Sequence, residues 1–230
     1  MTAEVVVGVA LIASAVSFNV AFARLARAFD YPDVLRRDPA DILERFGAGG
    51  TDLILRWWSF MLVAVAFVPL GAATPSVVVP GTVVGTVAGA LGIAAGLVQA
   101  IGLVRWPFLV PDLARRHAAA STAEERATIE TVFAAVHRLS GVGIGEHLGY
   151  LLTGAWTMAM SVGIATAAAP AVAWWLAVLG MIVGLALCVG SLEFVGPNEE
   201  RGWPIADRLV PIAYLGWSVS LIVLGIALVA

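Results

Sequence analysis

The sequence predicts an all-α, polytopic transmembrane helix bundle with six transmembrane helices, both termini outside the cell, and amphipathic cytoplasmic loop helices. Apolar residues make up 60% of the 230 residues, charged residues make up only 13%, and the mean hydropathy is +0.95. No ordinary soluble domain has this composition. The apolar residues form continuous runs, whereas the strands of a membrane barrel would alternate apolar and polar residues. The chain has no lysine, and its arginines gather in three connections between the runs.

Each predicted helix is an apolar run long enough to cross a bilayer. A hydrocarbon core of ~30 Å needs about 20 helical residues, and the chain offers six such stretches: 4–24, 53–73, 82–104, 147–168, 172–193 and 208–229. Little of the chain remains for a soluble domain. We therefore expect residues 1–230 to form a single integral membrane domain, with the lipid bilayer as its partner and the inner (plasma) membrane as its location.

The first run is expected to remain in the protein as a helix. No arginine precedes the apolar run at 4–24, and the first arginines, Arg24 and Arg27, lie at its end and just after it. This charge order is typical of an anchor with its N-terminus outside, and a secretory signal peptide would have the opposite order.

Two of the connections contain signals for helices of their own. Asp38 can cap a short surface helix over residues 39–46, with Pro39 in its first turn and Gly47 after its end. Thr122 and Glu125 form the pattern of a capping box for a second helix. That helix carries an apolar stripe, which predicts contact with the membrane face or the bundle: Ile129, Val132, Phe133, Val136 and Leu139.

The positions of the arginines orient the predicted bundle. Six of them lie between residues 24 and 56, five between 105 and 138, and two at 201 and 208. The connections at 74–81 and 169–171 and both chain ends carry none. Cytoplasmic loops are enriched in cations, so the three arginine-bearing connections should face the cytoplasm. Tryptophans then fall at both interfaces: Trp174 and Trp175 at the outer one, and Trp57, Trp58, Trp106 and Trp203 at the inner one.

Small residues recur every four positions in the third, fourth and fifth runs. Lipid gives helices no hydrophobic reason to associate, so close backbone contact across small residues is a main route to packing. These spacings predict helix contacts and offer glycine-rich faces for a homo-oligomer: Gly81, Gly85 and Gly89; Gly92, Gly96 and Ala100; Gly141, Gly145 and Gly149; and Gly180, Gly184 and Cys188. Cys188 is the single cysteine, so an intrachain disulfide is excluded.

Polar residues gather at the inner ends of the predicted helices, and the stretch GEHLGYLLTGAWT, residues 145–157, holds the most unusual pair. Glu146 and His147 flank the glycines at 141, 145 and 149, beside a predicted helix contact. Tyr150 lies one turn further on nearly the same face. The candidate ligand-binding residues at this depth are Glu146, His147, Arg105, Tyr150, Glu193, Asn19 and Gln99.

Two interpretations of these polar residues stay open. In the structural one, they lie at the interface or cross-link helices by hydrogen bonds. In the functional one, they line a polar pocket open to the cytoplasm, because ionisable groups at membrane depth are costly and mark sites or pathways. A small amphipathic ligand would then be bound or transported, with Arg105 or Arg138 offsetting the Glu146 carboxylate.

A haem- or metal-binding membrane protein is a further interpretation. His137 and His147 are its weak candidate ligands, and no other metal site is indicated. On one helix these histidines face away from each other, so a shared haem would need a broken helix or a second subunit.

The remaining interpretations are a membrane enzyme acting on a lipid and a non-catalytic accessory subunit. In the enzyme, Glu146 or His147 would act as general base, but the nearby hydroxyls of Ser140, Tyr150 and Thr153 form no recognisable triad. The catalytic residues therefore stay unknown, and a protein without enzyme activity is the preferred interpretation. Nucleic acid is not expected as a partner, since acids are interleaved with the arginines.

Four stretches of the chain resemble the pattern of a family of small bacterial six-helix integral membrane proteins catalogued only as a domain of unknown function. They are FDYPDVLRR (29–37), RWPFLVPDLA (105–114), GEHLGYLLTGAWT (145–157) and the C-terminal RLVPIAYLGWSVSLIVLGIALV. The resemblance spans nearly the whole chain. It implies six helices and an inner-face polar cluster, and it implies no activity.

Overall fold

The fold, seen in a computed structural model that describes residues 1–167 and 174–230, is helical, with no strand among the described residues. Two 3₁₀ turns, η1 (Asp33–Arg36) and η3 (Ser191–Phe194), and one π-helical segment, η2 (His137–Leu148), join the α-helices. The α-helices are α1 (Ala3–Phe29), α2 (Pro39–Val78), α3 (Val83–Phe108), α4 (Val110–Ala119), α5 (Ala123–Val136), α6 (Gly149–Thr166), α7 (Trp174–Gly190), α8 (Pro197–Arg201) and α9 (Pro204–Val229).

The prediction of an all-α bundle with six membrane helices is confirmed. Six helical stretches are long and apolar enough to cross a membrane: Ala3–Phe29, Pro39–Val78, Val83–Ala119, Ala123–Thr166, Trp174–Phe194 and Pro204–Val229. The predicted connection at 169–171 and the adjoining ends of two predicted spans lie outside the described residues.

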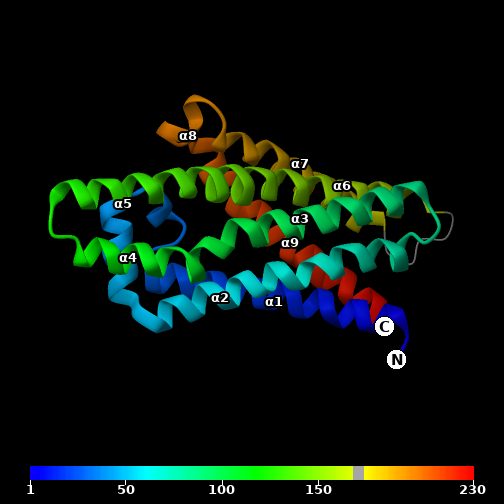
Figure 1. Ribbon diagram of the computed structural model, residues 1–230. Helices are drawn as coiled ribbons and strands as arrows, with labels where there is room; N and C mark the ends of the chain where they lie inside the picture. Colours follow the sequence, from blue (N-terminus) through cyan, green and yellow to red (C-terminus); the bar gives the residue numbers. More distant parts are fainter. Residues whose placement is uncertain (168–173) are drawn as a thin grey trace.

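The membrane helices pack in chain order into a closed ring. α1 contacts α2, α2 contacts α3, and α3 contacts α6; α6 contacts α7, α7 contacts α9, and α9 returns to α1. Figure 1 shows both termini at one end of this ring, while α4, α5 and α8 lie at the opposite end. We call this opposite end the arginine-bearing end, because the connections that carry the arginines lie there.

Two hydrophobic clusters fill most of the ring. One includes Phe67, Trp156 and Trp217, and the other includes Trp57 and Trp106 toward the arginine-bearing end. The rings of Trp57 and Trp106 stack with their centroids 4.4 Å apart, and both side chains are fully buried. Their predicted place in an interfacial belt is therefore wrong, because they point into the bundle, whereas Trp58 is exposed.

Two long helical rods extend the ring at the arginine-bearing end. α4 continues α3, α5 runs through η2 into α6, and the two extensions pack against each other (Figure 1). The predicted capping box at Thr122 and Glu125 is present. His117 Nε2 lies 2.8 Å from Glu130 Oε1 and joins α4 to α5. The His117 side chain is buried at this contact.

The predicted surface helix at residue 39 begins as expected but ends later. Gly47 is helical, and the break falls at Gly50, whose φ of 54° and ψ of −149° lie outside the helical region. Glycine reaches positive φ without the strain that a Cβ would add. The chain therefore bends at Gly50 and then continues as the membrane-spanning part of α2.

The apolar stripe predicted on the second surface helix packs only in part. Phe133 is buried, while Val132 and Leu139 are exposed. The change of helical period at His137, where η2 begins, accounts for the exposure of Leu139 but not for that of Val132, which lies on α5.

Three of the four predicted small-residue ridges form helix contacts. A Cβ added to Gly92 would lie 2.5 Å from the carbonyl oxygen of Gly71 on α2, and one added to Gly184 would lie 2.7 Å from that of Gly154 on α6. The ridge from Gly81 to Gly89 is not a contact: Gly81 lies in a turn with φ of 69°, and Gly89 has only a loose neighbour.

The Gly71–Gly92 contact gives a direct test of the ring. We expect Gly92→Ala to destabilise the protein by about 1–3 kcal/mol, because a methyl group must force two backbones apart. Gly89→Ala is the matched control on the same helix, where a Cβ would meet only the Ala72 carbonyl oxygen at 3.8 Å. Thermal unfolding in detergent should show a lower melting temperature for Gly92→Ala alone. Equal melting temperatures would contradict the contact.

Candidate functional site

A cavity of about 510 Å³ lies between the two hydrophobic clusters, in the half of the ring nearer the arginine-bearing end. Five of the six membrane helices and the loop after α1 line it, and α7 does not. Its wall residues are mostly aromatic or aliphatic: Phe18, Asn19, Phe22, Tyr31, Pro32, Phe60, Gln99, Gly102, Leu103, Arg105, Gly145, Glu146, Tyr150, Val210, Pro211, Tyr214 and Leu215. The sequence-predicted residues Glu146, Arg105, Tyr150, Asn19 and Gln99 therefore meet at one cavity.

The contact between α3 and the segment η2–α6 builds the polar wall. Gly141, Gly145 and Gly149 face α3 one after another. A Cβ added to Gly141 would lie 2.5 Å from the Arg105 guanidinium, one added to Gly145 would lie 2.9 Å from Gly102 Cα, and one added to Gly149 would lie 3.2 Å from Gln99 Cγ. The predicted ridge is thus a helix contact, and Glu146 flanks it as expected.

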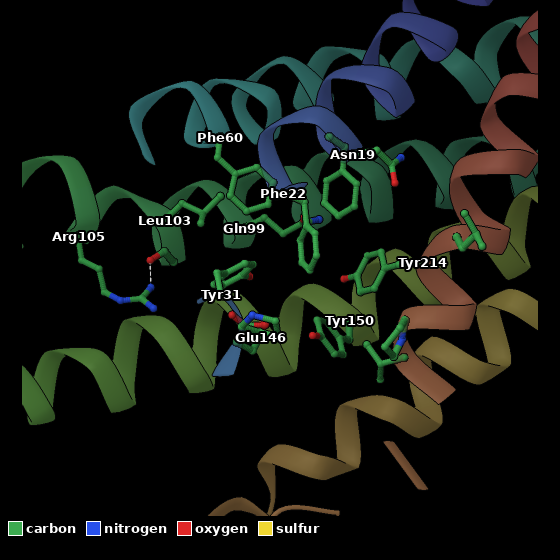
Figure 2. A pocket seen from close by; sticks show the side chains of 17 residues that line it. Asn19, Phe22, Tyr31, Phe60, Gln99, Leu103, Arg105, Glu146, Tyr150 and Tyr214 are labelled. Atoms are coloured by element: carbon green, nitrogen blue, oxygen red, sulfur yellow. Dashed lines mark hydrogen bonds between the residues drawn. The ribbon is translucent and has the colours of Figure 1, made fainter. Parts of the chain in front are cut away.

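Glu146 lies on the π-helical segment and opens to the cavity. Such segments are rare and occur often at functional sites. Among the described residues, no arginine forms an ion pair with its carboxylate. Figure 2 shows Glu146 between Tyr31 and Tyr150, with Arg105 set apart.

All three tyrosines of the chain line this cavity. The rings of Tyr150 and Tyr214 meet edge to face with centroids 5.2 Å apart, and Tyr31 packs against Phe22 at the same distance. Burial raises the pKa of the Tyr31 phenol well above its ordinary value, and the nearby Glu146 carboxylate raises it further. The Tyr31 hydroxyl therefore stays protonated and can donate a hydrogen bond.

Arg105 is buried, and its contacts hold it against its own helix. Its guanidinium donates to the Gly102 carbonyl oxygen and lies 5.0 Å from the centroid of the Trp106 ring. Arg138, the other cation expected near the acid, instead pairs with Glu199 at 2.8 Å. Neither arginine makes the direct pair with Glu146 that the sequence suggested.

Asn19 and Gln99 each tie two helices together at the cavity wall. Asn19 Nδ2 donates to Ser218 Oγ at 2.9 Å, and Gln99 Nε2 donates to Thr153 Oγ1 at 3.1 Å. Hydrogen bonds of this kind are the structural role that the sequence left open. The amide oxygens can still accept hydrogen bonds, because a side-chain amide has both donors and an acceptor.

The other predicted residues lie outside the cavity. His147 Nδ1 lies 2.9 Å from the Ser191 carbonyl oxygen, and His137 stacks on Phe133 with centroids 5.4 Å apart. The two histidines thus have different surroundings and do not converge. Glu193 is buried and pairs with Arg36, which fixes the loop that carries Tyr31 to η3.

A second hollow of about 690 Å³ adjoins the cavity at the arginine-bearing end. Charged side chains, including those of Arg36 and Glu193, line it. Glu146 and Tyr150 belong to the walls of both hollows. These two side chains therefore stand between the aromatic cavity and the charged groove.

Sequence reasoning did not assign Tyr31 and the phenylalanines of the wall to the site. Phe18, Phe22 and Phe60 are ordinary apolar residues of membrane helices, so nothing in their spacing marks a cavity. Tyr31 lies in a loop that the ion pair of Arg36 with the distant Glu193 ties to η3. One available signal was that the three tyrosines all fall near the arginine-bearing ends of their helices or loop.

Comparison with known proteins gives one match. A family model described as "Domain of unknown function (DUF4386)" matches residues 6–229. Neither the curated proteins nor the solved structures include a match to this chain.

The cavity predicts a pattern of cysteine reactivity. In a Cys188→Ala background, we expect Gln99→Cys to react with a small methanethiosulfonate reagent, because this position opens to the cavity. Ala95→Cys, one turn away on α3 and fully buried, should stay unmodified. Mass spectrometry of the labelled protein measures both. A Gln99→Cys protein as inert as Ala95→Cys would show that no space opens at this depth.

Proposed function

The chain belongs to the DUF4386 family, and we propose that this integral membrane protein binds a small amphipathic ligand in the cavity between its two hydrophobic clusters. The observation that carries the proposal is the Glu146 carboxylate, which faces an aromatic-walled cavity without an ion-pair partner among the described residues. The polar group of the ligand would lie at Glu146 and the tyrosines, and its apolar part against the phenylalanines.

The free-energy cost of placing the Glu146 side chain inside the bundle supports a ligand in the cavity. An ionisable side chain within a membrane protein is expensive and usually serves a pathway or a binding site. A purely structural acid would be expected to pair with a cation, since an unpaired buried charge is strongly unfavourable. The volume of about 510 Å³ falls within the range of about 300–1,000 Å³ that is usual for small-molecule sites.

Transport is the second candidate function, and the adjoining groove favours it. Glu146 and Tyr150 border both the cavity and the charged groove, so a ligand released past them would reach the arginine-bearing end. Binding alone requires only the cavity, and transport requires in addition that this boundary opens.

A membrane enzyme has less support than a binding protein. Two of the three nearby hydroxyls are engaged in hydrogen bonds of the bundle: Ser140 Oγ donates to the Val136 carbonyl oxygen, and Thr153 Oγ1 accepts from Gln99. His147 faces the Ser191 carbonyl oxygen. No hydrogen bond among the described residues therefore pairs a base with the hydroxyl of Ser140 or Thr153, as an activated nucleophile would require. The haem interpretation has less support for a similar reason, because His137 and His147 lie apart.

We also propose that the arginine-bearing end faces the cytoplasm and that both termini lie outside, in the inner (plasma) membrane. The positive-inside rule supports this orientation. The charged groove would then open to the cytoplasm.

Reporter fusions test the orientation. A reporter enzyme that works only outside the cytoplasm should be active when it is inserted at Pro80–Gly81, in the turn between α2 and α3. A reporter that works only in the cytoplasm should be active when it is inserted at Ala120–Ser121, between α4 and α5. A cytoplasmic signal at Pro80 together with an external signal at Ala120 would reverse the proposed orientation.

Filling the cavity tests the binding function. We expect Leu103→Trp to abolish capture of a small molecule from a membrane extract, because the indole occupies the cavity. Leu97→Trp on the lipid-facing side of the same helix should keep it. Native mass spectrometry of the purified protein after incubation with the extract reads out the bound mass. A wild-type protein with no bound mass, or equal capture by the two variants, would contradict ligand binding.

A further inference from the structure

We propose that the cavity selects an organic cation, a protonated amine or a quaternary ammonium or phosphonium group with apolar substituents. This inference rests on the proposed binding function and adds the chemical class of the ligand. It follows from how the two charged side chains of the cavity are engaged and from the aromatic rings around one of them.

The two charged side chains of the cavity wall differ in how far other groups of the protein already contact them. Among the residues that line the cavity, Glu146 and Arg105 are the two with charged side chains. The Arg105 guanidinium donates to the Gly102 carbonyl oxygen through Nη1, lies over Trp106 and packs against Gly141, and its buried Nε has no hydrogen-bond partner among the described residues. Glu146 makes no ion pair within the described parts of the chain. An incoming charged group therefore meets an acid without an ion-pair partner and a guanidinium held against its own helix.

Aromatic rings surround the Glu146 carboxyl group. Figure 2 shows Tyr31 and Tyr150 beside Glu146, with Tyr214 and Phe22 above them. The face of an aromatic ring attracts a cation, and several rings around one site form the usual recognition element for quaternary ammonium groups. A carboxylate among such rings adds a full negative charge to their attraction.

An anionic ligand fits this wall less well. It would have to approach Arg105, of which only 5% is exposed, and it would place a second negative charge in the same cavity as Glu146. Like charges held together in a low-dielectric site repel strongly. The cavity therefore discriminates by charge sign as well as by shape.

The test compares three probes of similar shape and different charge. They are tetraphenylphosphonium, tetraphenylborate and the uncharged triphenylmethanol. Equilibrium binding to the full-length protein in lipid nanodiscs is measured after subtraction of partition into protein-free nanodiscs. We expect saturable binding of tetraphenylphosphonium, at least about tenfold tighter than that of tetraphenylborate, since like-charge contacts cost several kcal/mol.

Variants of Glu146 separate a charge effect from general hydrophobic binding. Glu146→Gln keeps the shape of the side chain and should weaken tetraphenylphosphonium binding by about 30-fold or more. Glu124→Gln, an exposed position on α5, is the matched control and should bind like the wild type. Gel filtration checks that both variants remain folded.

Two substitutions of Tyr214 test the aromatic contribution to cation binding without changing Glu146. Tyr214→Phe keeps an aromatic face and should retain tetraphenylphosphonium binding, while Tyr214→Leu should weaken it by about 2- to 30-fold. If Tyr214→Phe and Tyr214→Leu change tetraphenylphosphonium binding equally, the Tyr214 ring does not contribute to recognition of the cation.

The outcomes distinguish this inference from the proposed function. If triphenylmethanol or tetraphenylborate binds as well as tetraphenylphosphonium, and Glu146→Gln changes nothing, the cation class is overturned while the binding cavity stands. If none of the three probes binds, or Leu103→Trp leaves binding intact, the cavity is not a binding site and both proposals fail.

Discussion

The contact between the backbones of α3 and the segment η2–α6 is the constraint on which the rest of the site depends. Gly102 and Gly145 lie so close that a side chain on either would overlap the other helix. Membrane helices gain little from apolar contact with each other and much from this kind of close approach. The contact fixes the depth of Arg105 on one helix and of Glu146 on the other, and Gly141 leaves room for the guanidinium to fold back. The acid is therefore left facing the cavity.

The ring of six helices explains why a cavity remains there. Tryptophans and phenylalanines fill the ring at two levels, around Trp156 and Trp217 on one side and around Trp57 and Trp106 on the other. The wall of the hollow adds tyrosines, a glutamate, an arginine and two amides to its apolar side chains, and such polar groups cannot pack in a dry apolar core without remaining unsatisfied. The hollow is thus a consequence of where polar residues interrupt the two clusters.

Features that depend on local or periodic patterns could be predicted from the sequence. The six apolar runs, the capping box at Thr122 and the contact face at Gly141, Gly145 and Gly149 are of this kind, and so is the gathering of Glu146, Tyr150, Asn19, Gln99 and Arg105 at one depth. Features that depend on distant partners could not be predicted. The loop that carries Tyr31 is tied to η3 by the Arg36–Glu193 pair, and the buried His117 contacts Glu130 across the α4–α5 turn. The π-helical segment has no residue signature that separates it from an α-helix, and Gly47 and Gly50 differ only in backbone conformation.

The confinement of every tyrosine to one cavity has a spectroscopic consequence. Phenylalanine and tryptophan, by contrast, occur in both hydrophobic clusters, so their signals average several environments. The phenol groups of Tyr31, Tyr150 and Tyr214 all lie at the cavity wall, and the chain has no fourth tyrosine. Isotope labelling of tyrosine, or Raman scattering from the phenol ring, would therefore report on the cavity alone in the unmodified protein. The chain carries its own set of probes at the place where its chemistry is concentrated.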